Sequence, residues 1–128
     1  MTEKDYYQYW LETAEDAFST AKDLLKLEHY NYCLFFCHLA IEKLIKGLIF
    51  KHTKKHALPI HNLRKLAASA ALPLTSTREQ ELAEIATWNI EDRYDNLKRE
   101  FDKKADKNFT LAWFSKVEKI YLWLKNQY

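Results

Sequence analysis

The sequence has very few of the residues that make turns. It contains one glycine and two prolines in 128 residues, whereas glycine alone makes up about 7% of an average protein. A fold built from many short strands needs turn residues at each connection, so this composition argues against most all-β architectures. Long helices joined by a few loops need almost none. We therefore predict an all-α fold, an up-and-down bundle of four long helices with one short extra helix.

Cysteines, long apolar runs and excess charge are also scarce. Cys33 and Cys37 lie four residues apart on an apolar helix face and match neither a CxxC redox motif nor a zinc pattern, so we expect buried free thiols. The longest unbroken apolar run, 32–37, is far shorter than the about 20 residues of a membrane span, and no secretory signal opens the chain. The net charge of +2 lacks the basic excess of most nucleic-acid-binding domains. These features predict one cytoplasmic domain, residues 1–128, without a membrane segment.

What the sequence does contain is one long apolar stretch, residues 30–50, around which the rest can pack. Its apolar side chains follow the i, i+3, i+4, i+7 spacing of a helix. They cover most of the circumference, so several other elements must surround this helix. One polar strip interrupts it, because His38, Glu42 and Lys46 are spaced by four residues with Lys43 beside them. The strip is either a solvated seam or part of a site.

Four further helices are expected around this stretch, two of them in the first part of the chain. Apolar periodicity predicts one over about residues 5–27, with Thr2 and Asp5 as its N-terminal cap. A tight link makes it antiparallel to the central helix. The short helix follows the central one, with Pro59 in its first turn, and it ends before Pro73.

The last third of the chain is expected to supply two helices and a loop. The inward stripe of the first continues from Ile85 to Asn89 and Arg93, at i+4 and i+8, so an amide and a guanidinium face inward late in that helix. The segment 95–107 is dominated by charge and predicts a solvated loop. Asn108 is expected to cap the last helix.

Three histidines near a basic segment, 51–58, raise the question of a metal site. His52 and His56 face one way if the central helix extends that far, and His61 lies just beyond. No acidic or sulfur ligand is nearby in the sequence, so we expect a solvated loop and no bound metal. His61 and Asn62 begin the short helix, where they either cap it or present polar groups at an N-terminus that favours anions.

Seven polar residues are those that a generic bundle explains least. Lys and Arg hold phosphates, Tyr stacks on a base, and His and Asn hydrogen-bond sugar or phosphate oxygens. One expectation is therefore a groove that binds a nucleotide or RNA, with no catalytic group and no cofactor. The alternative is an internal network in which Glu42 pairs with Arg93 or a lysine and fixes how two helices meet. The seven residues are Glu42, Lys43, Lys46, His61, Asn62, Arg93 and Tyr94.

Three short motifs, AIEKLIKG at 40–47, IHNL at 60–63 and RY at 93–94, resemble the HEPN family in this order and spacing. The name stands for higher eukaryotes and prokaryotes nucleotide-binding. The resemblance covers nearly the whole chain and implies a helical bundle, frequent homodimers and, in prokaryotes, a partner nucleotidyltransferase, often in a toxin–antitoxin pair. Where many relatives have a proline after the RY motif, this chain has Asp95 and Asn96. The motif positions carried over are Glu42, Lys43, Lys46, His61, Arg93 and Tyr94.

The ribonuclease members of this family carry an Arg followed, after four to six residues, by a His. That order cannot occur here, because the last histidine is His61 and the first arginine is Arg64. Neither a Ser–His–Asp set nor a pair of catalytic carboxylates replaces it. We rank first a non-catalytic nucleotide- or RNA-binding module acting with a nucleotidyltransferase in a toxin–antitoxin-like or defence system. A structural homodimeric interaction protein comes second, and a ribonuclease toxin with a divergent site third.

Overall fold

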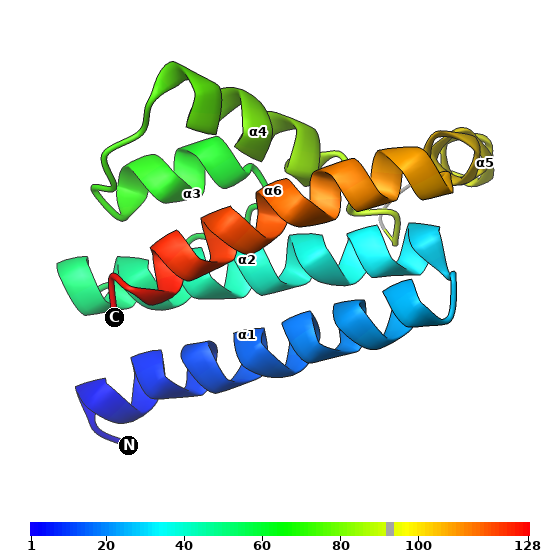
Figure 1. Ribbon diagram of the computed structural model, residues 1–128. Helices are drawn as coiled ribbons and strands as arrows, with labels where there is room; N and C mark the ends of the chain where they lie inside the picture. The colour runs from blue at the N-terminus through cyan, green and yellow to red at the C-terminus, as the bar shows by residue number, and fades with distance from the viewer. Residues whose placement is uncertain (92–93) are drawn as a thin grey trace.

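A computed structural model describes residues 1–91 and 94–128, and over these residues the chain forms six α-helices and no strand (Figure 1). The predicted all-α bundle is confirmed. The number and lengths of the helices differ from the predicted four long helices and one short one, because three of the observed helices are long and three are short. The helices are α1 (Glu3–Lys26), α2 (Tyr30–Thr53), α3 (Leu63–Ser69), α4 (Ser76–Ala86), α5 (Asp95–Lys104) and α6 (Lys107–Lys125).

The first two helices form an antiparallel hairpin (Figure 1). α1 begins at the expected cap: the Thr2 hydroxyl accepts a hydrogen bond from the Asp5 amide, and the Asp5 carboxylate accepts one from the Thr2 amide. These bonds satisfy amides that the first turn of a helix leaves without partners. The link between α1 and α2 is short, and Glu28 adopts a left-handed backbone with φ of 63° within it.

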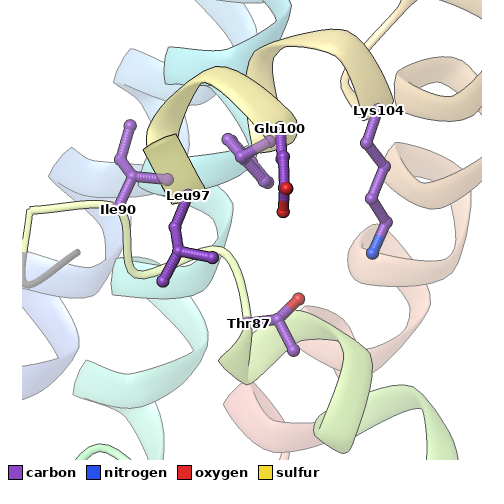
Figure 2. Close-up of a pocket in the computed structure, with 6 residues that line it drawn as sticks. Thr87, Ile90, Leu97, Glu100 and Lys104 are labelled. Atoms are coloured by element: carbon purple, nitrogen blue, oxygen red, sulfur yellow. The ribbon is translucent and has the colours of Figure 1, made fainter. Parts of the chain in front are cut away.

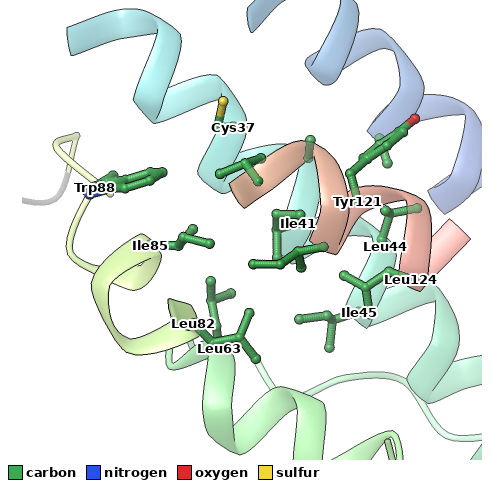
Figure 3. Close-up of a cluster of buried hydrophobic side chains, with 14 of the residues drawn as sticks. Cys37, Ile41, Leu44, Ile45, Leu63, Leu82, Ile85, Trp88, Tyr121 and Leu124 are labelled. Carbon is green, nitrogen blue, oxygen red and sulfur yellow. The ribbon is translucent and has the colours of Figure 1, made fainter. Parts of the chain in front are cut away.

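α2 is the central helix, as predicted. α1 and α6 pack along it, and α3, α4 and α5 also contact it. Fourteen of its 24 residues are buried, so only a narrow part of its surface remains for solvent. Figure 3 shows Ile41, Leu44 and Ile45 in the middle of the core, with Leu82 and Ile85 of α4 on one side. The two cysteines of α2 are buried free thiols, as expected.

The single glycine of the chain, Gly47, marks a close approach to α2. A Cβ atom there would lie 2.7 Å from Cβ of Trp10 and closer still to the Tyr128 hydroxyl. That hydroxyl donates a 2.7 Å hydrogen bond to the Leu44 carbonyl oxygen, and burial raises the pKa of Tyr128. The missing side chain therefore lets Tyr128, which follows α6, dock against the centre of the bundle.

The predicted course of the fourth helix was wrong. α4 ends at Ala86, with Thr87 as its C-terminal cap, so Asn89 does not continue its inward stripe. Asn89 is nevertheless buried, in irregular chain after the helix. Arg93, the next predicted member of that stripe, lies outside the described residues.

The segment predicted as a solvated loop contains a helix, α5, and this prediction was also wrong. Phe101 and Ala105 lie four residues apart, are both buried and anchor the segment to the core. Lys104 adds an ion pair of 2.6 Å to Glu84 of α4. A hollow of about 180 Å³ remains between the end of α4 and α5, and Figure 2 shows side chains that line it. Its described lining consists of Thr87, Ile90, Leu97, Glu100, Phe101 and Lys104.

Two expected helix starts are shifted. Asp106, not Asn108, caps α6, because its carboxylate accepts a 2.8 Å hydrogen bond from the Phe109 amide. α3 begins after Asn62, so Pro59 lies in the preceding link rather than in the first turn. Within the part of the chain that the structure covers, no helix is long and apolar enough to cross a membrane.

Candidate functional site

His38 and Glu42 of the polar strip on α2 are buried, and Glu42 is the centre of the strip. Glu42 is only 6% exposed and His38 is fully buried, so the interpretation as a solvated seam was wrong. One Glu42 carboxylate oxygen, Oε1, lies 2.8 Å from Nδ1 of His61 and 3.6 Å from Nε2 of His38. The other, Oε2, lies 3.4 Å from Nζ of Lys46. We call these four residues the Glu42 cluster.

Helix spacing and the start of α3 together build the Glu42 cluster. His38 and Lys46 stand one turn before and one turn after Glu42 on the same face of α2. His61 comes from the chain just before α3, and α3 packs against α2. The hydrogen bond between His61 and Glu42 therefore fixes the chain before α3 on the central helix.

The charges of the Glu42 cluster explain its ionisation. Burial alone would raise the pKa of the Glu42 carboxyl group, but the contacts with His38 and His61 and the charge of Lys46 outweigh burial and lower it to about 2. Glu42 is thus a carboxylate at neutral pH. It is deeply buried, whereas the side chain of His61 is 51% exposed and that of Lys46 is 15% exposed. The cluster therefore opens to solvent at His61.

His38 was noticed in the sequence strip but not counted among the seven site residues. Its spacing of four residues from Glu42 was the signal that places it in the cluster. Neither of its ring nitrogens has a hydrogen-bond partner in the described part of the chain, so Nε2 interacts with Glu42 electrostatically across 3.6 Å.

The structure does not bring all seven predicted residues together. Glu42, Lys46 and His61 are in direct contact. Lys43 turns toward α1, with Nζ 5.7 Å from the ring centroid of Trp10. The side-chain oxygen of Asn62 accepts a 3.1 Å hydrogen bond from the Lys65 amide, which is the capping alternative foreseen for it.

The RY motif lies at the border of the described chain. Tyr94 is 83% exposed and stands at the N-terminal end of α5. Arg93 lies outside the described residues, so its expected pairing with Glu42 lies outside them as well. Glu42 has lysine and histidine partners that account for its charge.

The histidines of the basic segment serve packing and helix ends. α2 extends to Thr53 and includes His52, whose Nδ1 lies 2.8 Å from the Ala70 carbonyl oxygen beyond α3. His56 follows the helix and packs against the rings of Tyr6 and Phe50, with centroids 5.1 and 5.0 Å away. Over residues 1–91 and 94–128, no group of three or more His, Cys, Asp or Glu side chains is placed to hold a metal ion.

Comparison with known proteins places this architecture in a family. A model of the HEPN domain matches residues 7–127. The crystal structure of TT1696 from Thermus thermophilus superposes with a TM-score of 0.76 over 95% of this chain and 98% of that one. Its sequence identity is 19%, so it is similar in fold. No curated protein sequence gives a significant match. The match to the family model spans almost the entire bundle, and the chain therefore belongs to the HEPN domain family.

Proposed function

We propose that this chain is a non-catalytic nucleotide- or RNA-binding module that acts with a nucleotidyltransferase partner in a toxin–antitoxin-like or defence system. The observation that carries the proposal is the Glu42 cluster, which is buried at Glu42 and opens to solvent at His61. Glu42 holds one edge of the His61 ring through Nδ1 and directs the opposite edge away from the carboxylate. Lys46 adds a positive charge beside it.

This arrangement suits a phosphate or a ribose hydroxyl. The ammonium of a lysine donates hydrogen bonds, and the imidazole of a histidine can donate or accept one. Both groups can therefore bind such oxygens. Glu42 acts in this scheme as the group that positions them. Arg93 and Tyr94 remain proposed ligand contacts on the strength of their motif. Lys43 and Asn62 remain in the proposal as residues at the edge of the groove, although each has a structural partner.

The same cluster also supports a second function, that of a structural interaction protein without a nucleotide. A buried carboxylate that has several partners is a common way to fix how two elements meet. We propose a homodimer in either case, because Tyr32, Leu111 and Leu122 are each about half exposed and association of two copies can bury exposed apolar side chains. Sedimentation velocity at micromolar concentration measures this, and a mass of 15.4 kDa would contradict the dimer.

Titration calorimetry of the purified protein with ATP, GTP and AMP tests nucleotide binding. We expect saturable binding, weakened about tenfold or more in His61→Ala and Lys46→Ala, since each removes a charge-assisted contact worth about 1.5–3 kcal/mol. Lys119→Ala, an exposed lysine of α6, is the control and should bind as the wild type does. If no nucleotide binds and His61→Ala loses several kcal/mol of stability, the structural function holds instead.

Two further measurements concern chemistry and partner. We expect no cleavage of RNA by the purified protein, because the Arg-then-His order of the family's ribonucleases is absent. Cleavage that disappears in His61→Ala would establish a ribonuclease with a divergent site.

Purification of the tagged protein from its native host, followed by mass spectrometry, tests the partnership. It should recover a nucleotidyltransferase in stoichiometric amount, and recovery of the protein alone would count against the partnership.

A further inference from the structure

Charge is distributed very unevenly along the chain. Residues 43–78 contain eight of the 20 lysines and arginines and none of the 18 aspartates and glutamates. The rest of the chain therefore carries 12 basic and 18 acidic side chains. The basic segment forms the second half of α2, the link to α3, α3 itself and the start of α4. In the fold these parts gather at the end of the bundle where α2 finishes (Figure 1).

Part of this positive charge is balanced inside the protein. Lys46 pairs with Glu42, and Lys54 pairs with Glu3 at 3.1 Å. Arg78, near the far end of the segment, pairs with Glu81 at 3.6 Å. These pairs reduce the charge that the three side chains present to an external anion.

Three exposed cations of the segment remain outside such pairs. Lys55, Arg64 and Lys65 are exposed, and none of them forms an ion pair with a residue that the structure describes. Arg64 and Lys65 stand in the first turn of α3, three and four residues after His61. The three cations therefore extend the positive surface from the Glu42 cluster toward the end of α2.

A groove of about 470 Å³ lies beside Lys55, which forms part of its lining. Its walls are largely apolar, and Leu58 is 66% exposed at its edge. Lys65 belongs to the same surface because Ser69, one helical turn later, lines the groove and its hydroxyl donates a hydrogen bond to the Lys65 carbonyl oxygen. The lining residues are Ile49, Thr53, Lys55, His56, Ala57, Leu58 and Ser69.

An apolar groove next to exposed cations fits a ligand with a flat apolar part and a chain of negative charges. Single-stranded RNA has both, because its bases are free to stack while its phosphates follow a basic surface. An acidic peptide supplies charges without the flat bases of RNA. An anionic membrane is bound through the apolar face of an amphipathic helix, whereas the apolar side chains here line a groove. The groove volume also lies within the range of small-ligand sites, and the imidazole of His56 offers a ring at its wall.

We infer that Lys55, Arg64 and Lys65, together with this groove, form a basic surface that binds single-stranded RNA. The phosphates lie along the three cations, one base enters the groove beside His56 and Leu58, and the strand continues to the Glu42 cluster. The inference rests on the proposed function and specifies its ligand as a strand rather than a mononucleotide.

Fluorescence anisotropy with a fluorescein-labelled, mixed-sequence 12-nucleotide RNA (about three times the shortest site of a single-strand-binding fold) tests this surface. The basic-surface variant combines Lys55→Ala, Arg64→Ala and Lys65→Ala. The control combines Arg99→Ala, Lys107→Ala and Lys119→Ala, which are also exposed and change the net charge equally. Circular dichroism should show both variants folded, because all six side chains lie at the surface.

We expect the basic-surface variant to bind the RNA at least about tenfold more weakly than the wild type, and the control to bind within about twofold. The slope of log K against log salt should become shallower by about 2, as expected for three lost phosphate contacts on a single strand. Equal losses in both variants would overturn the inference, because they would show a response to net charge alone. Equal affinity for a duplex of the same length would overturn the single-strand assignment.

ATP titrations on the same variants separate this inference from the proposed function. If ATP binds the wild type and the RNA binds no more tightly than ATP, the RNA surface is refuted and the nucleotide site stands. If ATP does not bind but the RNA binds and the basic-surface variant loses it, the RNA surface stands and the mononucleotide site fails. Binding of phosphatidylserine vesicles or a polyglutamate peptide in place of the RNA would refute the RNA assignment.

Discussion

Glu42 is a buried carboxylate on the central helix. The side chains around it determine how much its burial costs in stability. His61, Lys46 and His38 surround it at 2.8, 3.4 and 3.6 Å. Removing one member of a buried charged pair leaves the other without compensation, which costs several kcal/mol. The Glu42 cluster is therefore expected to contribute to stability whether or not it binds a ligand.

Glu42→Gln tests this contribution. The substitution keeps the shape of the side chain and removes the charge that Lys46 and His61 face, so we expect the free energy of unfolding at pH 7 to fall by about 3 kcal/mol. The matched control is Glu3→Gln, which removes an exposed partner of Lys54 and should cost less than about 1 kcal/mol. Equal losses in urea unfolding would show that the burial of Glu42 has no special effect.

The pH dependence follows from the same group. The pKa of Glu42 is about 2 in the folded chain, below its ordinary value of 4.5, so the folded state holds the proton less tightly than the unfolded state. The stability from this difference is present above pH 4.5 and is lost as the pH falls toward 2. Urea unfolding should therefore show a steeper acid loss for the wild type than for Glu42→Gln. Parallel curves between pH 4.5 and 2 would contradict this assignment.

Gly47 gives a second prediction for a single residue. Replacing a glycine in a helix interior by alanine normally stabilises a protein by about 0.5–1 kcal/mol. Here the added methyl group would collide with Trp10 and with the Tyr128 hydroxyl, so we expect Gly47→Ala to lower the free energy of unfolding by about 1–3 kcal/mol. A stabilised variant would show that Tyr128 does not dock against α2.

Among the elements, α2 contributes more buried residues than any other helix, and its central place can be tested by truncation. Ile41 and Leu44 are fully buried, so Ile41→Ala and Leu44→Ala should each cost about 2–5 kcal/mol. Leu122→Ala on α6, where the side chain is 53% exposed, is the control and should cost less than about 1 kcal/mol. Similar losses of stability at the buried and exposed positions would show that α2 is not at the centre of the bundle.

The elements that the sequence predicted well are those with long, regular apolar periods. α1 and α2 were expected within a few residues of their observed ends, because their stripes run over many turns. α5 was missed because its buried residue, Phe101, and its buried C-terminal cap, Ala105, are outnumbered by charges. Their spacing of four residues was the available signal.

The end of α4 was missed for a tertiary reason. No glycine or proline stops the helix, and Asn89 continues its spacing. Instead the Thr87 hydroxyl donates a 2.6 Å hydrogen bond to the Glu84 carbonyl oxygen. Trp88 is fully buried, and its indole N–H donates to the Glu84 carboxylate at 2.8 Å. The fit of Trp88 into the core, which depends on α6 residues such as Trp113, cannot be read from local spacing.

The candidate site shows the same limit. Helix spacing joined Lys46 to Glu42, and the family motif added His61. The direction of Lys43 was not predictable, because it depends on Trp10 of a different helix. Spacing within one element thus identified the members of the Glu42 cluster on α2, whereas contacts between elements decided which other predicted residues reach it.

At the scale of the whole molecule, basic and acidic side chains are unevenly distributed, although the net charge is only +2. The segment 43–78 is basic without any acidic residue, and the remainder carries more acidic than basic side chains. The Glu42 cluster lies at the start of this basic region, and the groove beside His56 lies further along it. A ligand bound at the cluster would therefore meet further positive charge in the direction of α3 and the end of α2.

The central claim is that the Glu42 cluster binds a nucleotide, and chemical-shift mapping tests it most directly. Backbone amide spectra of the isotope-labelled protein, recorded during an ATP titration, locate the binding surface residue by residue. We predict saturable shifts that are largest over residues 42–46 and 60–65 and that disappear in His61→Ala, while that variant remains folded. Absence of shifts at saturating ATP, or shifts centred on the hollow between α4 and α5, would contradict the account.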